Sequence, residues 1–259
     1  MAIRPLLSNV SPRRGLGGAG GFKRGVLSAA VAPSTILTNL VAYWKLDETS
    51  GSRADSAGTN TLTDNNTVTA AAGKIGNAGQ FTAASSEYLD IADNAALSMG
   101  NIDFTMWAWV YLDSEVSDRS IIGKWGSSGA LAALEYELGY SSSSDRFRFR
   151  VADGIITLGS VSANNFGAIT TATWYFVVGY HDAAGDVIGI SVNDGAANTT
   201  AYSAGVLNGA NRFALGRAGE FNGNYWNGRI DEVGVRKQLL TATERTSLYN
   251  NGNGLSYPF

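Results

Sequence analysis

The stretch Phe104-Thr105-Met106-Trp107-Ala108-Trp109-Val110 decides the fold class of this chain. Successive side chains of a β-strand point to opposite faces, so every second residue from Phe104 to Val110 lies on one side and Trp107 and Trp109 lie on the other. Both sides are apolar, which predicts a strand that is buried on its two faces. We expect these aromatic side chains to pack in a hydrophobic core.

The same period of two recurs along the chain from residue 41 onward. Further strands are expected in Val41–Glu48, Arg146–Val151, Trp174–Tyr180, Val187–Val192, Phe213–Gly216 and Arg229–Val235. Ala183-Ala184-Gly185-Asp186 separates two of these segments at the spacing of a hairpin. About a dozen short strands joined by turns, in a chain with 32 glycines, predict an all-β, antiparallel sandwich.

One short helix is expected near the C-terminus. Thr241-Ala242-Thr243-Glu244 has the pattern of a capping box, in which Thr241 is the N-cap and Glu244 lies three residues further on. The helix would run about two turns, to a stop before Gly252. We expect it to close one edge of the sandwich.

Several short motifs in a fixed order point to a known family. The motifs are Val41-Ala42-Tyr43-Trp44-Lys45-Leu46-Asp47-Glu48, Ala54-Asp55-Ser56-Ala57-Gly58, Gly73-Lys74-Ile75-Gly76, Phe104–Val110 and Gly228-Arg229-Ile230-Asp231-Glu232-Val233. Together they resemble the laminin-G-like jelly roll, a branch of the concanavalin A-like lectin and glucanase fold. The resemblance covers roughly residues 40–252 and implies a jelly-roll sandwich that serves mostly as a scaffold for binding and display.

The charge distribution divides the chain into residues 1–40 and residues 41–259. The first 40 residues hold five basic side chains and no acidic one, whereas the remaining residues hold 14 basic and 22 acidic ones, a net charge of −8. The segment around Gly15–Phe22 is too rich in glycine for a helix and too poor in apolar residues for a core. We therefore expect an extended basic arm before the jelly roll, either disordered or ordered on a partner.

Protein is the expected partner of this arm. Its basic residues are Arg4, Arg13, Arg14, Lys23 and Arg24. Only Phe22 could stack on a nucleic-acid base, so an acidic protein surface is a better partner than nucleic acid.

The chain also has no cysteine, which excludes disulfides and thiolate metal sites. No run approaches the roughly 18 apolar residues of a membrane span.

An enzyme is not expected, although the fold also hosts glucanases. Their strand motif of the type Glu-x-Asp-x-x-Glu has no match in this sequence. Glu135 and Glu137 lie on the same face of one strand, but nothing nearby distinguishes this pair from acidic residues on a solvated strand face. The single histidine, His181, is expected to cap a turn or to be exposed, since no nucleophilic serine motif accompanies it.

Structural calcium is a candidate cofactor. Asp231 shares a strand face with apolar residues, and a buried carboxylate is costly unless it is paired or binds a cation. The resemblance implies a structural calcium in many members, and Asp55 and Asp231 match acidic positions of the family's recurring motifs. Calcium takes oxygen ligands, including backbone carbonyls. The alternative is that Asp231 accepts hydrogen bonds from turn amides or pairs with an arginine.

Carbohydrate is a candidate ligand. Lectin-like sites combine aromatic faces with amide and carboxylate groups on loops. The loop Glu220–Asn227 and the Trp125 region have that composition. The candidate residues are Trp125, Tyr225, Trp226, Asn222 and Asn224. The alternative is that Tyr225 and Trp226 begin the last strand and pack inward.

Together these features favour a non-enzymatic structural or decoration protein of a virus particle, most plausibly of a bacteriophage. Its arm would attach to a capsid or other virion protein, and its jelly roll would be displayed on the virion surface as a homo-oligomer. The alternative is a secreted bacterial carbohydrate-binding or adhesion module. The apolar run Val26–Ala32 is a weak secretory leader because Ser28 interrupts it.

Overall fold

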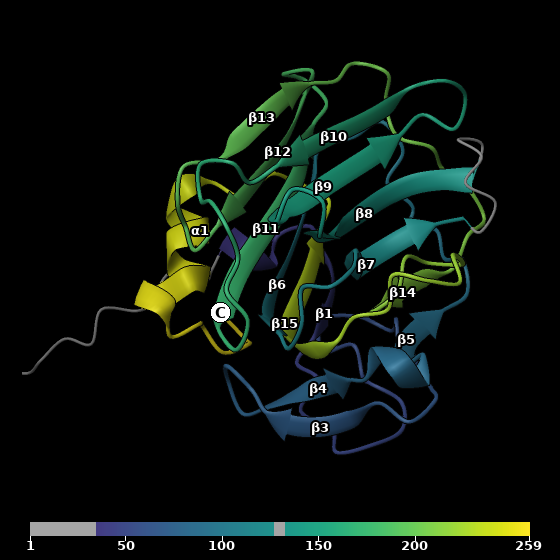
Figure 1. Cartoon of the computed structure of the whole chain (residues 1–259). Helices are drawn as coiled ribbons and strands as arrows, with labels where there is room; N and C mark the ends of the chain where they lie inside the picture. The colour runs from purple at the N-terminus through teal and green to yellow at the C-terminus, as the bar shows by residue number, and fades with distance from the viewer. Residues whose placement is uncertain (1–34, 127–132) are drawn as a thin grey trace, which may run out of the picture. The chain divides into compact units, whose positions relative to one another are not determined.

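The computed structural model describes residues 35–126 and 133–259, which form fifteen strands, one α-helix and short 3₁₀ turns (Figure 1). The expected all-β sandwich is confirmed, since every strand pair is antiparallel and the strands form two sheets. No helix among the described residues is long and apolar enough to cross a membrane. The five basic residues of the predicted arm lie outside the described residues.

We call the first sheet sheet I. It has eight strands, and most of the expected long strands belong to it. In spatial order they are β13 (Asn198–Ala201), β12 (Val187–Val192), β11 (Trp174–Asp182), β6 (Phe104–Leu112), β15 (Gly228–Arg236), β4 (Asn77–Phe81) and β3 (Thr69–Ala72), and β1 (Leu40–Trp44) also pairs with β15.

Sheet II packs against sheet I and has seven strands. In spatial order they are β10 (Leu158–Ser162), β9 (Arg146–Ala152), β8 (Leu134–Ser141), β7 (Arg119–Trp125), β14 (Phe213–Leu215), β5 (Tyr88–Ile91) and β2 (Thr63–Asn65). In β9, Phe147, Phe149 and Val151 are buried, whereas the arginines between them are partly exposed. This alternation places one face of sheet II on the core.

The main hydrophobic core fills the space between the two sheets. Trp44 of β1 stacks on Phe213 of β14, with ring centroids 5.1 Å apart, and so joins the two layers directly. Trp226 belongs to the same core and has no exposed surface. These large apolar side chains supply the burial that stabilises a sandwich without disulfides.

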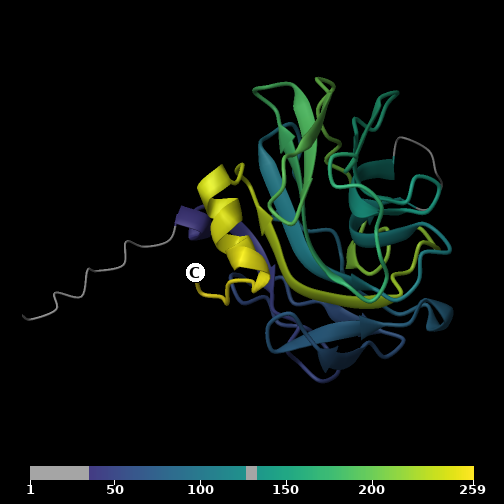
Figure 2. The same ribbon diagram turned by 60° about the vertical axis from the view of Figure 1, so that its left-hand side comes forward.

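A third layer covers the outer face of sheet I. Trp107 and Trp109 of β6 point away from the main core, as the alternation predicts, and pack with Leu248 of helix α1 (Ala242–Tyr249). Figure 2 shows α1 on the side of sheet I that faces away from sheet II. The predicted helix is confirmed, but its expected position at a sheet edge is wrong. It covers central strands, because both faces of β6 are apolar and the outer one must also be buried.

The capping box of α1 is present as predicted. The Glu244 amide donates to the Thr241 side chain at 3.2 Å, and the Thr241 amide donates to the Glu244 carboxylate at 2.8 Å. The same carboxylate accepts hydrogen bonds from the hydroxyl of Thr35 at 2.7 Å and from buried Arg236 of β15 at 3.0 Å. Glu244 therefore ties the helix both to sheet I and to the start of the domain.

The folded domain begins earlier than the charge pattern suggests. Residues 35–40, which the sequence assigns to the arm, contain the 3₁₀ turn η1 (Thr35–Leu37) and the first residue of β1. Ile36 is 3 % exposed and packs in the layer under α1. A second turn, η2 (Ala83–Ser85), precedes β5, and η4 (Asn250–Gly252) follows α1.

Strand β15 has an irregular centre. Its register with β6 shifts between Asp231 and Gly234, and Glu232 there has a positive φ of 50°. Before the shift β15 pairs with β4, and after it β15 pairs with β1. The bulge thus lies where β15 changes its partner on this edge from β4 to β1.

Replacing Glu244 by glutamine is expected to destabilise the domain by about 3 kcal/mol, because buried Arg236 would keep its charge without a carboxylate partner. Burial raises the pKa of Glu244, but the hydrogen bonds that its carboxylate accepts from Arg236, Thr35 and Thr241 outweigh this effect and lower the pKa to about 2. The wild-type pair thus contributes stability above the ordinary glutamate pKa of 4.5 and loses it as the pH falls toward 2.

Urea unfolding at pH 7 and at pH 3 measures both effects. The Glu244→Gln variant should lose less stability than the wild type over this change of pH. The matched control is Glu220→Gln, at an exposed glutamate, which should change stability by less than about 0.5 kcal/mol. Equal pH dependence of the Glu244 variant and the wild type would contradict the role of this pair.

Candidate functional site

The loop predicted to bind carbohydrate is largely structural. Trp226 lies in the main core with no exposed surface, so its ring cannot stack on a sugar in this structure. The Asn224 carbonyl accepts a hydrogen bond from the Ser120 amide at 2.8 Å, which fastens the loop to β7. The hydroxyl of half-buried Tyr225 donates to exposed Asn222 at 2.6 Å. Of the predicted loop residues, Asn222 is exposed, Asn224 and Tyr225 are half-buried, and these three retain surface that a ligand could contact without a change of structure.

Trp125 is also poorly accessible. Only 6 % of its surface is exposed, and the guanidinium of Arg150 lies over its ring, 4.7 Å from the centroid. Glu220 donates its amide to the Trp125 carbonyl at 2.8 Å, so the start of the loop is packed on this tryptophan. The ring is thus already covered by a cation–π contact and by its own loop.

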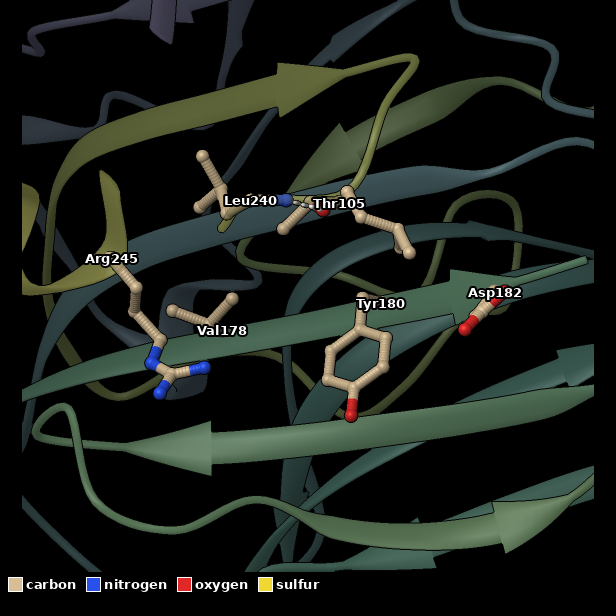
Figure 3. Close-up of a pocket in the computed structure, with 7 residues that line it drawn as sticks. Thr105, Val178, Tyr180, Asp182, Leu240 and Arg245 are labelled. Atoms are coloured by element: carbon tan, nitrogen blue, oxygen red, sulfur yellow. Dashed lines mark hydrogen bonds between the residues drawn. The ribbon is translucent and has the colours of Figure 1, made fainter. Parts of the chain in front are cut away.

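The structure instead forms a pocket on the outer face of sheet I, beside α1 (Figure 3). Its volume is about 220 Å³, smaller than the roughly 300–1,000 Å³ of pockets for drug-sized ligands. The lining residues come from β6, β11, α1 and the segment between β15 and α1. They are Thr105, Val178, Tyr180, Asp182, Leu239, Leu240 and Arg245.

Tyr180 forms the aromatic surface of this pocket. It faces Thr105 of β6 on one side and Gly189 of β12 on the other. A Cβ atom at Gly189 would collide with the Tyr180 ring, so the missing side chain there lets the ring lie across β12. Burial raises the pKa of Tyr180, which keeps its hydroxyl protonated at neutral pH.

The walls of the pocket are held by the segment that leads into α1. Thr105 donates its hydroxyl to the Gln238 carbonyl at 2.9 Å and accepts the Leu240 amide at 3.1 Å. Figure 3 shows Val178 and Arg245 on one side of the Tyr180 ring and Asp182 on the other. The pocket therefore combines a ring, aliphatic walls, a cation and a carboxylate.

Sequence reasoning missed this site. Tyr180 was expected only as the last residue of a strand and Arg245 only as a residue of the C-terminal helix, and no role was assigned to Asp182. The pattern that could have indicated it is the alternation of Val178, Tyr180 and Asp182 on one strand face opposite Gly189. Nothing in the local sequence shows that α1 would bring Arg245 to that face.

The two predicted calcium ligands serve different networks. Both oxygens of Asp55 are occupied: Oδ1 accepts the amides of Tyr43 and Ala57, and Oδ2 accepts the amide and side chain of Asn60. These four donors fill the acceptor capacity of a carboxylate, so Asp55 does not fit a calcium site. It organises the turn after β1.

Asp231 has room for a further partner. Its Oδ2 accepts the amides of Lys74 and Ile75 at 2.7 and 3.0 Å, as the turn-amide alternative predicts. Its buried Oδ1 has no partner among the described residues. Burial and the nearby carboxylates of Glu232 and Asp47 raise the pKa of Asp231 to about 8, although the two amides oppose this. A cation would fit the free oxygen.

The acidic cluster around Asp231 is nevertheless incomplete as a metal site. Within residues 35–126 and 133–259, no three His, Cys, Asp or Glu side chains are grouped so that they could hold a metal ion. Glu232 accepts a hydrogen bond from the Tyr43 hydroxyl, and burial raises the pKa of Glu232 to about 7. A cation here would depend on backbone carbonyls and water for most of its ligands.

The remaining titratable residues considered from sequence are buried. Glu137 is paired with Arg150 and accepts a hydrogen bond from Ser120, and Glu135 accepts one from Lys124 at 2.6 Å. His181 is 1 % exposed, and its Nδ1 lies 2.8 Å from the Ile102 carbonyl. The expectations of a solvated strand face and of an exposed histidine were therefore wrong, whereas the contact of His181 with the Ile102 carbonyl, in the bend before β6, agrees with the turn-capping alternative. His181 packs against the core rings of Phe104 and Tyr202, and Glu137 lies between Ser120 of β7 and Arg150 of β9.

Comparison with known proteins supports the fold. The family described as the concanavalin A-like lectin/glucanases superfamily matches residues 82–244. No curated protein sequence matches the chain. Domain 4 of AbnA, a GH43 extracellular arabinanase from Geobacillus stearothermophilus, was solved in complex with arabinotriose. It has a TM-score of 0.60 and 18 % identity over 84 % of this chain and 98 % of that chain.

Two toxin structures are also similar. The binding domain of Paraclostridial Mosquitocidal Protein 1 has a TM-score of 0.65 and 14 % identity, over 84 % of this chain and 53 % of that one. A botulinum neurotoxin type C structure, described by the dependence of cell entry on two ganglioside molecules, has a TM-score of 0.59 and 11 % identity, over 85 % and 53 %. The chain spans about half of each toxin chain, and the low identities show a shared fold alone.

The Tyr180–Gly189 contact makes a specific prediction. Gly189→Ala should destabilise the domain by about 1–3 kcal/mol, because the added methyl group overlaps the Tyr180 ring. In the Tyr180→Ala background the same change should cost much less. A double-mutant cycle from urea unfolding measures this coupling. Additive effects of the two substitutions would show that the ring does not lie over Gly189.

Proposed function

Because the chain belongs to the concanavalin A-like lectin/glucanases superfamily, we propose that its jelly roll binds carbohydrate and catalyses no reaction. The observation that carries this proposal is the pocket of about 220 Å³ around Tyr180. An aromatic ring can lie against the C–H face of a sugar, while Asp182 and Arg245 supply directional hydrogen bonds. Such a pocket is large enough for a single sugar unit rather than a long chain.

The similar structures support this proposal by analogy. One of them was solved with arabinotriose, and another is described by its interaction with gangliosides. A purely binding role is supported by the state of Glu135 and Glu137, which are buried and engaged with Lys124, Arg150 and Ser120. Paired carboxylates of a glycosidase must instead reach a substrate.

We propose further that the protein is carried on a virus particle by its first residues. The support is the separation of charge, with five basic and no acidic residues in positions 1–40 against a net charge of −8 in the rest. A basic segment before an acidic domain is suited to contact an acidic surface of a capsid or other virion protein. The alternative remains a secreted adhesion module with the same jelly roll.

Calcium is proposed at Asp231 alone. Its Oδ1 would be one of the 6–8 oxygen ligands that calcium takes, and backbone carbonyls and water would supply most of the others. The cation would offset the charge of a carboxylate that burial disfavours. Asp55 has no part in this proposal because its oxygens are already occupied.

Glycan binding is tested on an array at millimolar ligand with calcium present. The Tyr180→Ala variant should bind about tenfold more weakly than the wild type, since the ring supplies the stacking surface. Tyr225→Ala is the matched control, in the loop before β15, and should change affinity by less than about twofold. An array without hits would contradict carbohydrate binding, and a loss of binding in the Tyr225 variant alone would place the ligand on the predicted loop.

The calcium proposal predicts a dependence on pH. The folded-state pKa values of Asp231 and Glu232, about 8 and about 7, lie above the ordinary values of 3.8 and 4.5. Protonation therefore favours the folded state, and stability in chelator should fall as the pH rises from about 5 to 9. Calcium should restore the melting temperature at pH 8–9, and Asp231→Asn should remove the response to calcium and reduce the pH dependence to the part that Glu232 contributes.

Asp55→Asn is the control for this experiment. It should lower the melting temperature, because it weakens the turn, and yet leave the response to calcium unchanged. If calcium does not change the melting temperature of the wild type, no calcium is bound at Asp231. Asp231 would then be buried in its protonated, uncharged form.

Anchoring is tested by removing residues 1–34, which spares Thr35 and β1. The truncated protein should keep its melting temperature and should no longer sediment with the particles, because the basic contacts are gone. Replacing the four arginines and the lysine of the arm by glutamine in the full chain should act in the same way. Unchanged association of the truncated protein with particles would contradict the anchoring role.

A further inference from the structure

Arg245 gives the pocket a cationic end. Its Nε donates to the Asp194 carboxylate at 2.9 Å, and the other oxygen of Asp194 accepts the Thr246 hydroxyl at 2.7 Å. Among the described residues, the guanidinium makes no other hydrogen bond. One edge of the planar group is therefore fixed, while the two terminal nitrogens keep their hydrogens for a ligand.

The opposite end of the pocket carries an acceptor. Asp182 lies beyond the Tyr180 ring from Arg245 (Figure 3). Its Oδ1 accepts the Gly185 amide at 2.6 Å, and its Oδ2 has no hydrogen-bond partner among the described residues. A ligand across Tyr180 would thus meet hydrogen-bond donors at one end, an acceptor at the other and an apolar ring between them.

We infer that the sugar held by this pocket carries a carboxylate, as a uronic or a nonulosonic acid does. The inference rests on the proposed carbohydrate-binding function of the same pocket. The carboxylate pairs with the two terminal nitrogens of Arg245, a ring hydroxyl donates to Asp182, and a C–H face covers Tyr180.

The physical reason is the geometry of the guanidinium. A carboxylate accepts two parallel hydrogen bonds from its free edge, and such charge-assisted pairs are about twice as strong as neutral ones. A neutral sugar hydroxyl matches only one of these donors. A dianionic phosphate fits less well than a carboxylate, because Asp182 and Asp194 place two negative charges near the pocket.

Nuclear magnetic resonance titration of the ¹⁵N-labelled full chain tests this inference. The probes are matched pairs of methyl glycosides, glucuronide against glucoside and galacturonide against galactoside, with the methyl glycoside of N-acetylneuraminic acid as the second source of carboxylate. The acidic member of at least one pair, or the neuraminate, should bind about tenfold more tightly than the neutral sugars. The largest shifts should be at Leu240 and at the Nε–H of Arg245.

Three variants separate the possible causes of a preference. Arg245→Gln should abolish the preference for acid, because glutamine keeps one amide donor group and loses the charged pair of terminal nitrogens, so acidic sugars should lose more affinity than neutral ones. Arg245→Lys keeps the positive charge but loses the two parallel N–H donors of the guanidinium, so it should show the preference only in part. Arg146→Gln is the matched control, since within the described part of the chain this arginine donates only to the carbonyls of its own turn, Ser144 and Asp145.

The outcomes distinguish this inference from the function on which it rests. If acidic and neutral sugars bind equally and Tyr180→Ala weakens both, the carboxylate preference is overturned and carbohydrate binding stands. A preference that survives in the Arg245→Gln variant also overturns it. If no sugar of the panel shifts the resonances of the pocket, both the inference and the proposed binding function are overturned.

Discussion

The bulge in β15 is the constraint on which the rest of sheet I depends. Between Asp231 and Gly234 the strand keeps β6 on one side and exchanges β4 for β1 on the other. Gly234 leaves the space that the Trp107 ring occupies, because a Cβ there would collide with it. Both features lie at the point where β1 replaces β4 as the partner of β15. The cost is a buried acidic pair, Asp231 and Glu232, in the middle of the sheet.

The placement of β1 beside β15 leads to the layer that carries the pocket. β1 brings the start of the domain next to Arg236, whose guanidinium donates to the carbonyls of Thr35 and Thr38 as well as to Glu244. Glu244 in turn caps α1 and fixes it over Trp107 and Trp109. The helix is thus held by polar contacts at its N-terminal end and by apolar contacts along its length.

The pocket is a consequence of this arrangement. Helix α1 covers β6 and stops short of the outer part of β11, so Tyr180 remains partly exposed beside it. The segment before the helix supplies Leu239 and Leu240, and the helix supplies Arg245. Because one network holds both the helix and the pocket wall, changes at Glu244 should affect ligand binding through the position of α1 as well as through stability.

The sequence alone determined the class of fold and several of its parts. Period-two alternation in Phe104–Val110 required a strand buried on both faces, and Thr241 with Glu244 required a capped helix. These features depend on neighbouring residues, so a linear reading was sufficient. It could not decide which apolar face received the helix, and it therefore placed the helix at an edge.

The functional residues depended on the tertiary structure. Trp226 was predicted to bind a ligand because asparagines surround it in the sequence, yet its amide donates to the Gly216 carbonyl and its ring packs in the main core. Asp55 was predicted to be available to a cation, but its carboxylate accepts hydrogen bonds from the backbone amides of Tyr43, Ala57 and Asn60. Conversely, Tyr180 and Arg245 come together only because α1 folds back across sheet I. Local pattern determines which elements form, whereas packing between distant elements decides which polar and aromatic groups remain available to a ligand.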